Sequence, residues 1–154
     1  MDFRSALKSG CYCLELRSST KQEIIEEMVD LLVTGGRIKP EHRDSVLKAI
    51  LDREKKMSTG VQHGVAIPHG KSDVVEELIT AVALKKDGVD FGSLDGEPSH
   101  IFIMTVSSVL RTGPHLQFLA EISKLLNVPS VRAKLLVATS VEELLGVLIS
   151  DQPA

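Results

Sequence analysis

The segment from Ser58 to Gly70 constrains the fold more than any other part of the sequence. Three glycines and one proline fall within these 13 residues, and no helix tolerates that density of breakers. The composition predicts a loop, then a short buried strand at 65–67, then a turn at 68–70. Helical patterns precede this segment and apolar strand patterns follow it, so the chain must combine both types of element.

Two amphipathic helices are predicted before this segment. The first begins at a capping box formed by Thr20 and Glu23 and ends at Gly35. The second is expected over 41–55, with Pro40 just ahead of it, where a helix start tolerates proline. The residues predicted to face the core are Ile24, Ile25, Met28, Val29, Leu31, Leu32 and Val33 in the first helix, and Val46, Leu47, Ile50 and Leu51 in the second.

Strands and then helices are predicted after the breaker-rich segment. The strands are expected over 79–85, extendable through 89–94, and over 101–106; the helices are expected over 115–126, 131–137 and 141–149. The apolar stripe of the 115–126 helix is predicted to be Leu116, Leu119, Ile122, Leu125 and Leu126. Turn and loop compositions separate these elements at 95–98 and 107–114. A single α/β domain over 1–154, with helices on both faces of a mixed sheet, accounts for this order.

Composition excludes several classes of function. The 46 branched aliphatic residues provide a packed core, whereas the absence of Trp, the 3% of aromatic residues and the net charge of −3 argue against nucleic-acid binding. The longest uncharged apolar run, 101–110, is about half of a bilayer crossing, and the first residues do not resemble a secretory signal. Cys11 and Cys13 are expected to be reduced thiols on one face of an extended segment, which fits a cytoplasmic protein.

Polar residues gather around the breaker-rich segment, namely Arg53, Ser58, Thr59, His63, His69 and Lys71. His69 follows a short apolar strand and precedes Gly70, which places its side chain at the rim of a sheet, where ligand sites of α/β proteins form. His115 begins a predicted helix after a loop, at a position where backbone N–H groups favour anions. His42 and His100 are interpreted as solvated side chains.

A metal site, a serine hydrolase and a nucleotide hydrolase are all disfavoured. His63 and His69 are six residues apart, which matches no common metal-ligand spacing. The chain also lacks a Gly-x-Ser-x-Gly elbow and a Walker loop. Two interpretations stay open. One is a histidine that accepts a phosphoryl group without a metal, assisted by donors from Arg53, Ser58, Thr59 and the second imidazole of His115; the other is a plain packing role for these residues.

The stretch 52–71, with Arg-Glu, then Ser-Thr-Gly, then Ala-Ile-Pro-His-Gly, resembles a specific family signature. It is similar to the enzyme IIA domains of the mannitol/fructose class in the bacterial phosphoenolpyruvate:sugar phosphotransferase system, and within that class to nitrogen-regulatory IIA proteins. Matching pieces at 91–96, 113–116 and 142–144 extend the resemblance over nearly the whole chain.

The resemblance implies a mixed five-stranded sheet between helices. It implies that His69 accepts a phosphoryl group from the histidine phosphocarrier HPr or its nitrogen-branch relative, with His115 as a second imidazole and Arg53 and Thr59 in the pocket. No cofactor or metal is implied. A regulatory role is expected, and the alternatives are a fructose/mannitol component that passes phosphate to a IIB domain and a non-catalytic interaction module.

The sequence departs from the family pattern at Met57, where the family often has Gly, and at Gln62-His63, which replaces a frequent Gly-Asn. The imidazole of His63 is therefore either an additional group that competes for the phosphate or tunes His69, or a solvated side chain.

Overall fold

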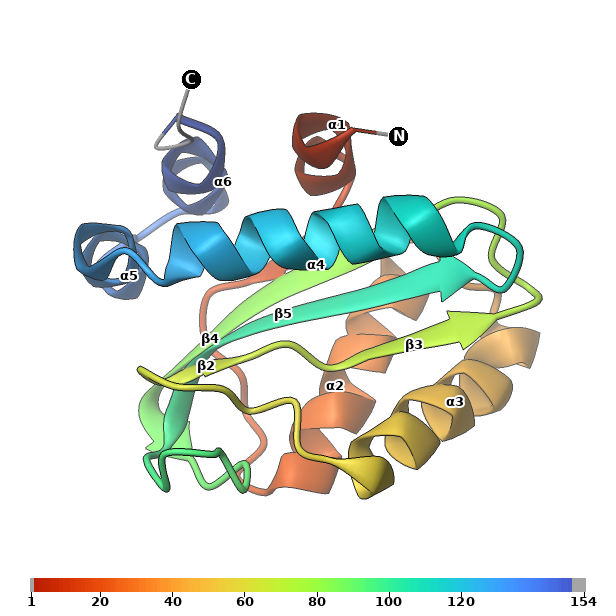
Figure 1. The fold of residues 1–154 in the computed structure, drawn as a ribbon, viewed down its shortest axis with the longest axis horizontal. Helices are drawn as coiled ribbons and strands as arrows, with labels where there is room; N and C mark the ends of the chain where they lie inside the picture. Colours follow the sequence, from red (N-terminus) through yellow and green to blue (C-terminus); the bar gives the residue numbers. More distant parts are fainter. Residues whose placement is uncertain (1, 151–154) are drawn as a thin grey trace.

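Five strands form one mixed sheet in the computed structural model, which describes residues 2–150 (Figure 1). The strands are β1 (Cys11–Cys13), β2 (Val65–Ala66), β3 (His69–Ser72), β4 (Ile79–Val89) and β5 (Ser99–Ser108). Their order is β1-β4-β5-β2. Strand β3 also pairs with β5, on the same side as β2 and further along β5. β1 runs parallel to β4, β4 antiparallel to β5, and both β2 and β3 parallel to β5. The predicted mixed five-stranded sheet is confirmed.

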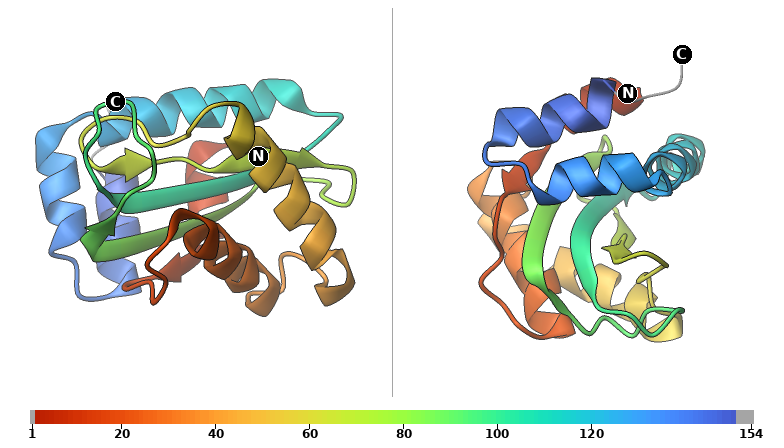
Figure 2. Two further views of the ribbon diagram at one scale, coloured as in Figure 1. Left: turned by 90° about the horizontal axis from the view of Figure 1, so that it is seen from below. Right: turned by 90° about the vertical axis from the view of Figure 1, so that its left-hand side faces the viewer.

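Helices cover both faces of this sheet, as predicted (Figure 2). One layer consists of α2 (Lys21–Thr34) and α3 (Arg43–Lys56), which are joined through a short 3-10 turn at Pro40–His42. The other layer consists of α1 (Phe3–Lys8), α4 (Thr112–Leu126), α5 (Pro129–Leu136) and α6 (Val141–Ser150). The first and last helices pack against each other. None of the helices within residues 2–150 is both long enough and apolar enough to cross a bilayer.

The alternation of side chains along the strands divides the core into two clusters. In β5, Ile101 and Ile103 face α4, α5 and α6, whereas Phe102 and Met104 face α2 and α3. All four side chains are buried, which explains why this strand reads as a continuous apolar run rather than as an alternating one.

The sequence pattern of α2 correctly predicts both of its ends. The Thr20 hydroxyl accepts a hydrogen bond from the backbone N–H of Glu23 at 3.3 Å, and the helix ends before Gly35. Gly36 adopts a positive φ of 76°, a conformation that side chains disfavour.

The turn predicted at 68–70 is wrong, because His69 begins β3 rather than occupying a turn. His69 to Ser72 pair with Thr105 to Ser108 of β5. This parallel pairing joins segments far apart in the sequence, so the local composition, rich in proline and glycine, gives no sign of it.

The start and the stripe of the helix predicted over 115–126 are also corrected. α4 begins at Thr112, so His115 lies within its first turn instead of at its start. His115 and Phe118 occupy the stripe that faces the sheet, and Leu116 is 60% exposed. The short α1 has no counterpart among the predicted elements.

Candidate active site

His69 stands at an interruption in the edge of the sheet. The edge pairs with β5 as two pieces, β2 and β3, with Ile67 and Pro68 between them. Pro68 has no N–H to contribute to a ladder, but its carbonyl accepts a hydrogen bond from the N–H of Thr105 at 3.0 Å. His69 then pairs with Thr105 in register, which places both side chains on the face of the sheet covered by α4.

One nitrogen of the His69 ring is hydrogen-bonded to a residue of the interruption between β2 and β3. Nδ1 lies 2.8 Å from the carbonyl oxygen of Ile67. Because a carbonyl oxygen only accepts, Nδ1 must carry the proton, and in the neutral ring the lone pair is then on Nε2. Burial lowers the pKa of His69 below its ordinary value; the hydrogen bond to Ile67 acts in the opposite direction, and the charge of Arg53 adds to the lowering.

His115 is held by two hydroxyl groups of β5. Its Nε2 lies 2.9 Å from Thr105 Oγ1 and its Nδ1 lies 2.8 Å from Ser107 Oγ. The two hydroxyls reach the same ring because residues two apart on a strand share a face. The residue is 2% exposed. Burial lowers the pKa of His115 to about 4, and the positive charge of Lys71 and the charge that His69 takes up only at acidic pH add to the lowering. The ring is therefore neutral at pH 7.

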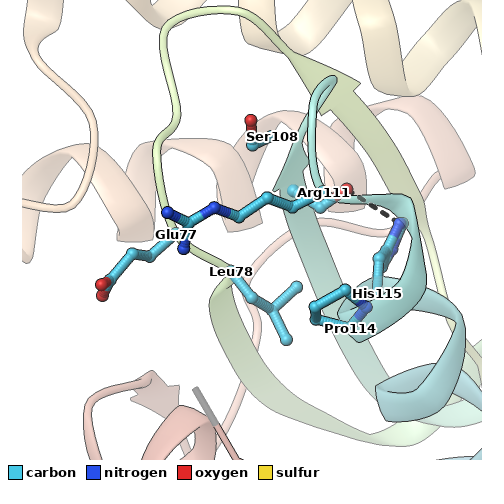
Figure 3. Close-up of a pocket in the computed structure, with 7 residues that line it drawn as sticks. Glu77, Leu78, Ser108, Arg111, Pro114 and His115 are labelled. Carbon is cyan, nitrogen blue, oxygen red and sulfur yellow. Dashed lines mark hydrogen bonds between the residues drawn. The ribbon is translucent and has the colours of Figure 1, made fainter.

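The two imidazole rings are neighbours, with centroids 5.6 Å apart and planes at 74°. A small pocket adjoins His115 (Figure 3). Its lining consists of Glu77, Leu78, Ser107, Ser108, Arg111, Pro114 and His115. Among residues 2–150, one imidazole therefore has a nitrogen without a hydrogen-bond partner, and it lies beside another imidazole whose nitrogens are both bonded.

Gly70 lets α3 approach β3 closely and so brings Arg53 towards His69. A Cβ atom at Gly70 would lie 3.1 Å from Ile50 Cγ1 and 3.3 Å from the carbonyl carbon of Ala49. Arg53 lies one turn beyond Ala49 on the same side of the helix. Its Nη1 donates to the carbonyl oxygen of Met57 at 2.7 Å, which caps the end of α3 and orients the guanidinium.

Lys71 adds a second positive charge on the side of His69. The two side chains point to the same face because they are two residues apart in β3. Lys71 Nζ donates to Thr112 Oγ1 at 3.1 Å and is exposed to solvent. The ammonium group therefore links β3 to the first turn of α4 at the rim of the site.

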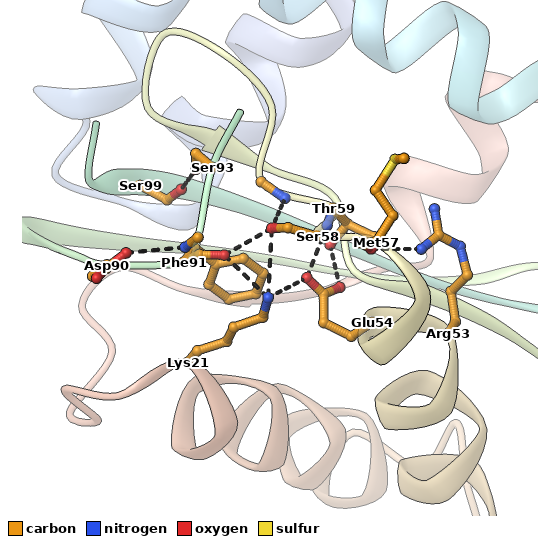
Figure 4. Close-up of polar contacts among 12 residues, drawn as sticks. Lys21, Arg53, Glu54, Met57, Ser58, Thr59, Asp90, Phe91, Ser93 and Ser99 are labelled. Atoms are coloured by element: carbon orange, nitrogen blue, oxygen red, sulfur yellow. Dashed lines mark hydrogen bonds and ion pairs between the residues drawn. The ribbon is translucent and has the colours of Figure 1, made fainter. Parts of the chain in front are cut away.

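The hydroxyls of Ser58 and Thr59 are bonded inside the protein. Ser58 Oγ donates to the carbonyl oxygen of Phe91 at 2.7 Å, and Thr59 Oγ1 donates to Glu54 Oε2 at 2.6 Å (Figure 4). Thr59 is buried, and Ser58 is partly buried. Both residues thus belong to a polar cluster beneath the loop that follows α3.

The structure does not bring His63 to the two paired histidines. It is exposed, with a positive φ of 64°, and its N–H donates to Asp95 Oδ2 at 3.1 Å. The next residue, Gly64, accepts from the N–H of Ile101, whereas His69 pairs with Thr105. Four residues of β5 separate these two points, which is about 13 Å along a strand.

Several residues of the site are absent from the sequence-based prediction. Thr105 and Ser107 are hydroxyl residues two apart in the second half of a strand that is mostly apolar in its middle, a pattern that could have indicated a polar partner on one face. Glu54 sits inside the family signature. Lys21 lies 33 positions before Glu54, and no local pattern connects the two. No group of three or more His, Cys, Asp or Glu side chains within residues 2–150 is arranged to hold a metal ion.

The sequence was compared with known protein families and proteins, and it is similar to members of one family. Residues 6–151 match the family described as phosphoenolpyruvate-dependent sugar phosphotransferase system, EIIA 2. A fructose-specific EIIA component of Haloferax volcanii is 38% identical over 135 residues, which cover 88% of this chain and 86% of the relative. A fructose-specific EIIABC component of Bacillus subtilis is 36% identical over 135 residues, and there the match covers 88% of this chain but only 21% of the longer relative.

Solved structures of enzyme IIA proteins superpose on this chain. The nitrogen regulatory protein IIA-Ntr of Neisseria meningitidis superposes with a TM-score of 0.85 at 28% identity, covering 94% of this chain and 97% of the other. The enzyme IIA of the mannitol system of Escherichia coli, in its complex with phosphorylated enzyme IIB, superposes with a TM-score of 0.75 at 29% identity, covering 90% and 94% of the two chains.

Proposed function

Because the chain belongs to the EIIA 2 family of the phosphoenolpyruvate-dependent sugar phosphotransferase system, we propose that Nε2 of His69 accepts a phosphoryl group in that system. A role in phosphoryl transfer follows from the family. The assignment of the atom is carried by one observation, the hydrogen bond of 2.8 Å between Nδ1 of His69 and the Ile67 carbonyl. The proton stays on Nδ1, and Nε2 is left with the lone pair that attacks phosphorus.

The donor is a phosphohistidine carrier, HPr or its nitrogen-branch relative. The N–P bond of the carrier breaks as the Nε2–P bond forms, and the carrier imidazole leaves with the electron pair of the broken bond. No proton has to be removed from the attacking nitrogen. The lowered pKa of His69 supports this step, because the ring stays uncharged at pH 7.

Positive charge near His69 suits the transferred group. A phosphoryl group brings about −1.5 to −2 charges if it titrates like a phosphorylated hydroxyl. Lys71 shares a face with His69, and the positive charge of Arg53 is felt by the His69 ring. His115, which is neutral and held by Thr105 and Ser107, packs beside the acceptor ring without adding charge.

Exposed apolar side chains around the site support docking of a carrier protein. Val74 follows β3, Val109 and Leu110 follow β5, and Leu116 lies next to His115 on α4. All four are exposed, and Leu110 is 89% exposed. Isolated apolar residues are common on surfaces, but a group beside a reactive side chain indicates a contact area.

The test is transfer to the purified protein from phosphorylated HPr, which is first prepared with phosphoenolpyruvate and enzyme I and then separated from them, so that a chelator acts on the last step alone. We expect one acid-labile phosphate per chain, unaffected by a chelator and lost in His69→Ala. The matched control is His42→Ala, a histidine of the turn before α3, which should be phosphorylated like wild type. Absence of phosphate on the wild-type protein would reject the proposal in favour of an interaction module, and loss of reaction with chelator would favour a metal-assisted hydrolase.

Two onward roles have separate support. The TM-score of 0.85 with a nitrogen regulatory protein favours a regulatory role, in which phosphorylation changes the partner surface. The 38% identity with a fructose-specific EIIA component, and the mannitol IIA–IIB complex among the similar structures, favour transfer to a IIB domain. Mixing the phosphorylated protein with a purified fructose-class IIB domain separates them, because only a transport component loses its phosphate rapidly to IIB.

A reducing cytoplasm is the compartment we propose for these reactions. Cys11 and Cys13 are both free thiols and lie at alternate positions of β1. Free thiols of this kind persist where disulfides are kept reduced.

A further inference from the structure

A nearly buried carboxylate lies next to Arg53, at the end of α3. Glu54 is 6% exposed. Its Oε1 accepts from the N–H of Thr59 at 2.8 Å, and its Oε2 accepts from the Thr59 hydroxyl at 2.6 Å. Lys21 Nζ, which comes from α2, lies 2.8 Å from the same Oε1. A buried carboxylate is costly unless it is paired and hydrogen-bonded, and here it is both.

Lys21 is itself held in place by the loop before β5. Its Nζ donates to the carbonyl oxygen of Phe91 at 3.1 Å and lies 4.8 Å from the centroid of the Phe91 ring (Figure 4). The cluster of Lys21, Glu54 and Thr59 therefore joins α2, α3 and the loop after α3 at one point. Buried ion pairs add little net stability on average. The effect of this pair is therefore to fix the position of the loop after α3 relative to α2 and α3.

Backbone hydrogen bonds connect Thr59 to His69. The Thr59 carbonyl oxygen accepts from the N–H of Ile67 at 3.0 Å. The Ile67 carbonyl oxygen accepts from Nδ1 of His69 at 2.8 Å. A continuous series of hydrogen bonds thus runs from the buried ion pair to the acceptor ring, and both backbone polar groups of Ile67 take part in it.

We propose that Lys21 and Glu54 are positioning residues for phosphoryl acceptance: by holding Thr59, they place the Ile67 carbonyl so that His69 keeps its proton on Nδ1 and its lone pair on Nε2. The role in phosphoryl acceptance rests on the proposed function. The role in fixing the tautomer does not, because it concerns the unphosphorylated protein.

The test uses Glu54→Gln, which preserves the shape of the side chain but removes the charge that Lys21 faces. A carboxamide also brings an NH₂ group opposite the two donors of Thr59. We expect ring ¹⁵N chemical shifts of His69 to show a smaller fraction of the Nδ1–H tautomer. Transfer from phosphorylated HPr at saturating carrier should fall by about tenfold or more, the size of effect expected from a small misplacement of a reacting group.

Three further variants keep the result interpretable. Lys21→Met breaks the pair from the other side, at a half-buried position that tolerates change, and should reproduce both effects if Glu54→Gln does not fold. Lys21→Arg keeps the positive charge and should restore most of the rate. Lys48→Met removes an exposed ion pair with Asp52 on the same helix and should leave both the tautomer and the rate unchanged.

Unchanged ¹⁵N shifts and an unchanged rate in Glu54→Gln and Lys21→Met would overturn the proposal, whatever happens to thermal stability. If the wild-type protein accepts no phosphate at all, the proposed function fails, and the ¹⁵N shifts of the variants still decide whether the ion pair fixes the tautomer.

Discussion

The imidazole rings of His69 and His115 lie almost perpendicular to each other, with centroids 5.6 Å apart, yet their nitrogens have different freedom. Both nitrogens of His115 are bonded to β5 hydroxyls, whereas Nε2 of His69 has no protein partner among the hydrogen bonds of residues 2–150. Only one of the two rings therefore has a nitrogen available for the attack on phosphorus that we propose, and the other is a fixed, uncharged neighbour.

The buried His115 should make the stability of the protein depend on pH. Its pKa of about 4 in the folded chain is below the value of about 6.5 expected when unfolded, so the unfolded state binds more protons between these values. The stabilisation is complete above pH 6.5 and is lost as the pH falls towards 4, by up to about 3 kcal/mol. Urea unfolding from pH 7 to pH 4 measures it. The free energy of unfolding should change less with pH in His115→Gln than in wild type. An equal pH dependence in the two proteins would contradict the lowered pKa of His115.

Substitution of Gly70 should disturb both packing and transfer. In Gly70→Ala, the new methyl group meets the backbone of α3 at Ala49, so we expect a loss of about 1–3 kcal/mol in the free energy of unfolding. Transfer to His69 should also slow, because α3 carries Arg53. The control is Gly146→Ala in α6, where a Cβ meets no atom of residues 2–150 within 4 Å apart from its chain neighbours and the helix's own backbone, so the change should be neutral or stabilising. A Gly70→Ala protein as stable and as active as wild type would refute the close-packing argument.

The exposed His63 should have no part in the transfer. In His63→Asn, we expect the same rate of phosphorylation as wild type, since the residue lies towards the other end of β5 from His69. Asparagine also tolerates the positive φ at this position, so the fold should be kept. Rates with phosphorylated HPr measure the effect, and a slower variant would revive the idea of a third imidazole acting on the phosphate.

Docking of the carrier should depend on the exposed leucine after β5. Leu110→Ser should raise the KM for phosphorylated HPr about three- to tenfold and leave kcat unchanged, as expected for a contact residue of moderate weight. Leu94→Ser is the matched control, because Leu94 is also an exposed leucine but lies in the loop before β5, at the far end from His69. If both variants behave alike, the carrier binds elsewhere.

Local patterns predicted the elements whose formation depends on near neighbours. The apolar stripe and caps of α2 are readable from the sequence because they repeat every three to four residues. β5 was recognisable because both of its faces are buried. The composition of His69 to Ser72 does not predict β3, because these four residues take their strand conformation from pairing with β5.

The same distinction applies to the site. The sequence identified His69 and His115 as candidates, and the structure brings them together. The partners that set their protonation are the Ile67 carbonyl, Thr105 and Ser107. These contacts join separate strands and a helix, so they become visible only when the chain is folded.

The break at Ile67 and Pro68 has a consequence for contacts between molecules. An exposed edge strand offers a row of unpaired N–H and C=O groups to which a strand of a second chain can add. Here one edge is divided by a proline into two short strands, and the strand at the opposite edge, β1, is three residues long. The irregularity that provides the Ile67 carbonyl for His69 therefore also leaves this edge without the long continuous row of groups that the addition of another chain requires.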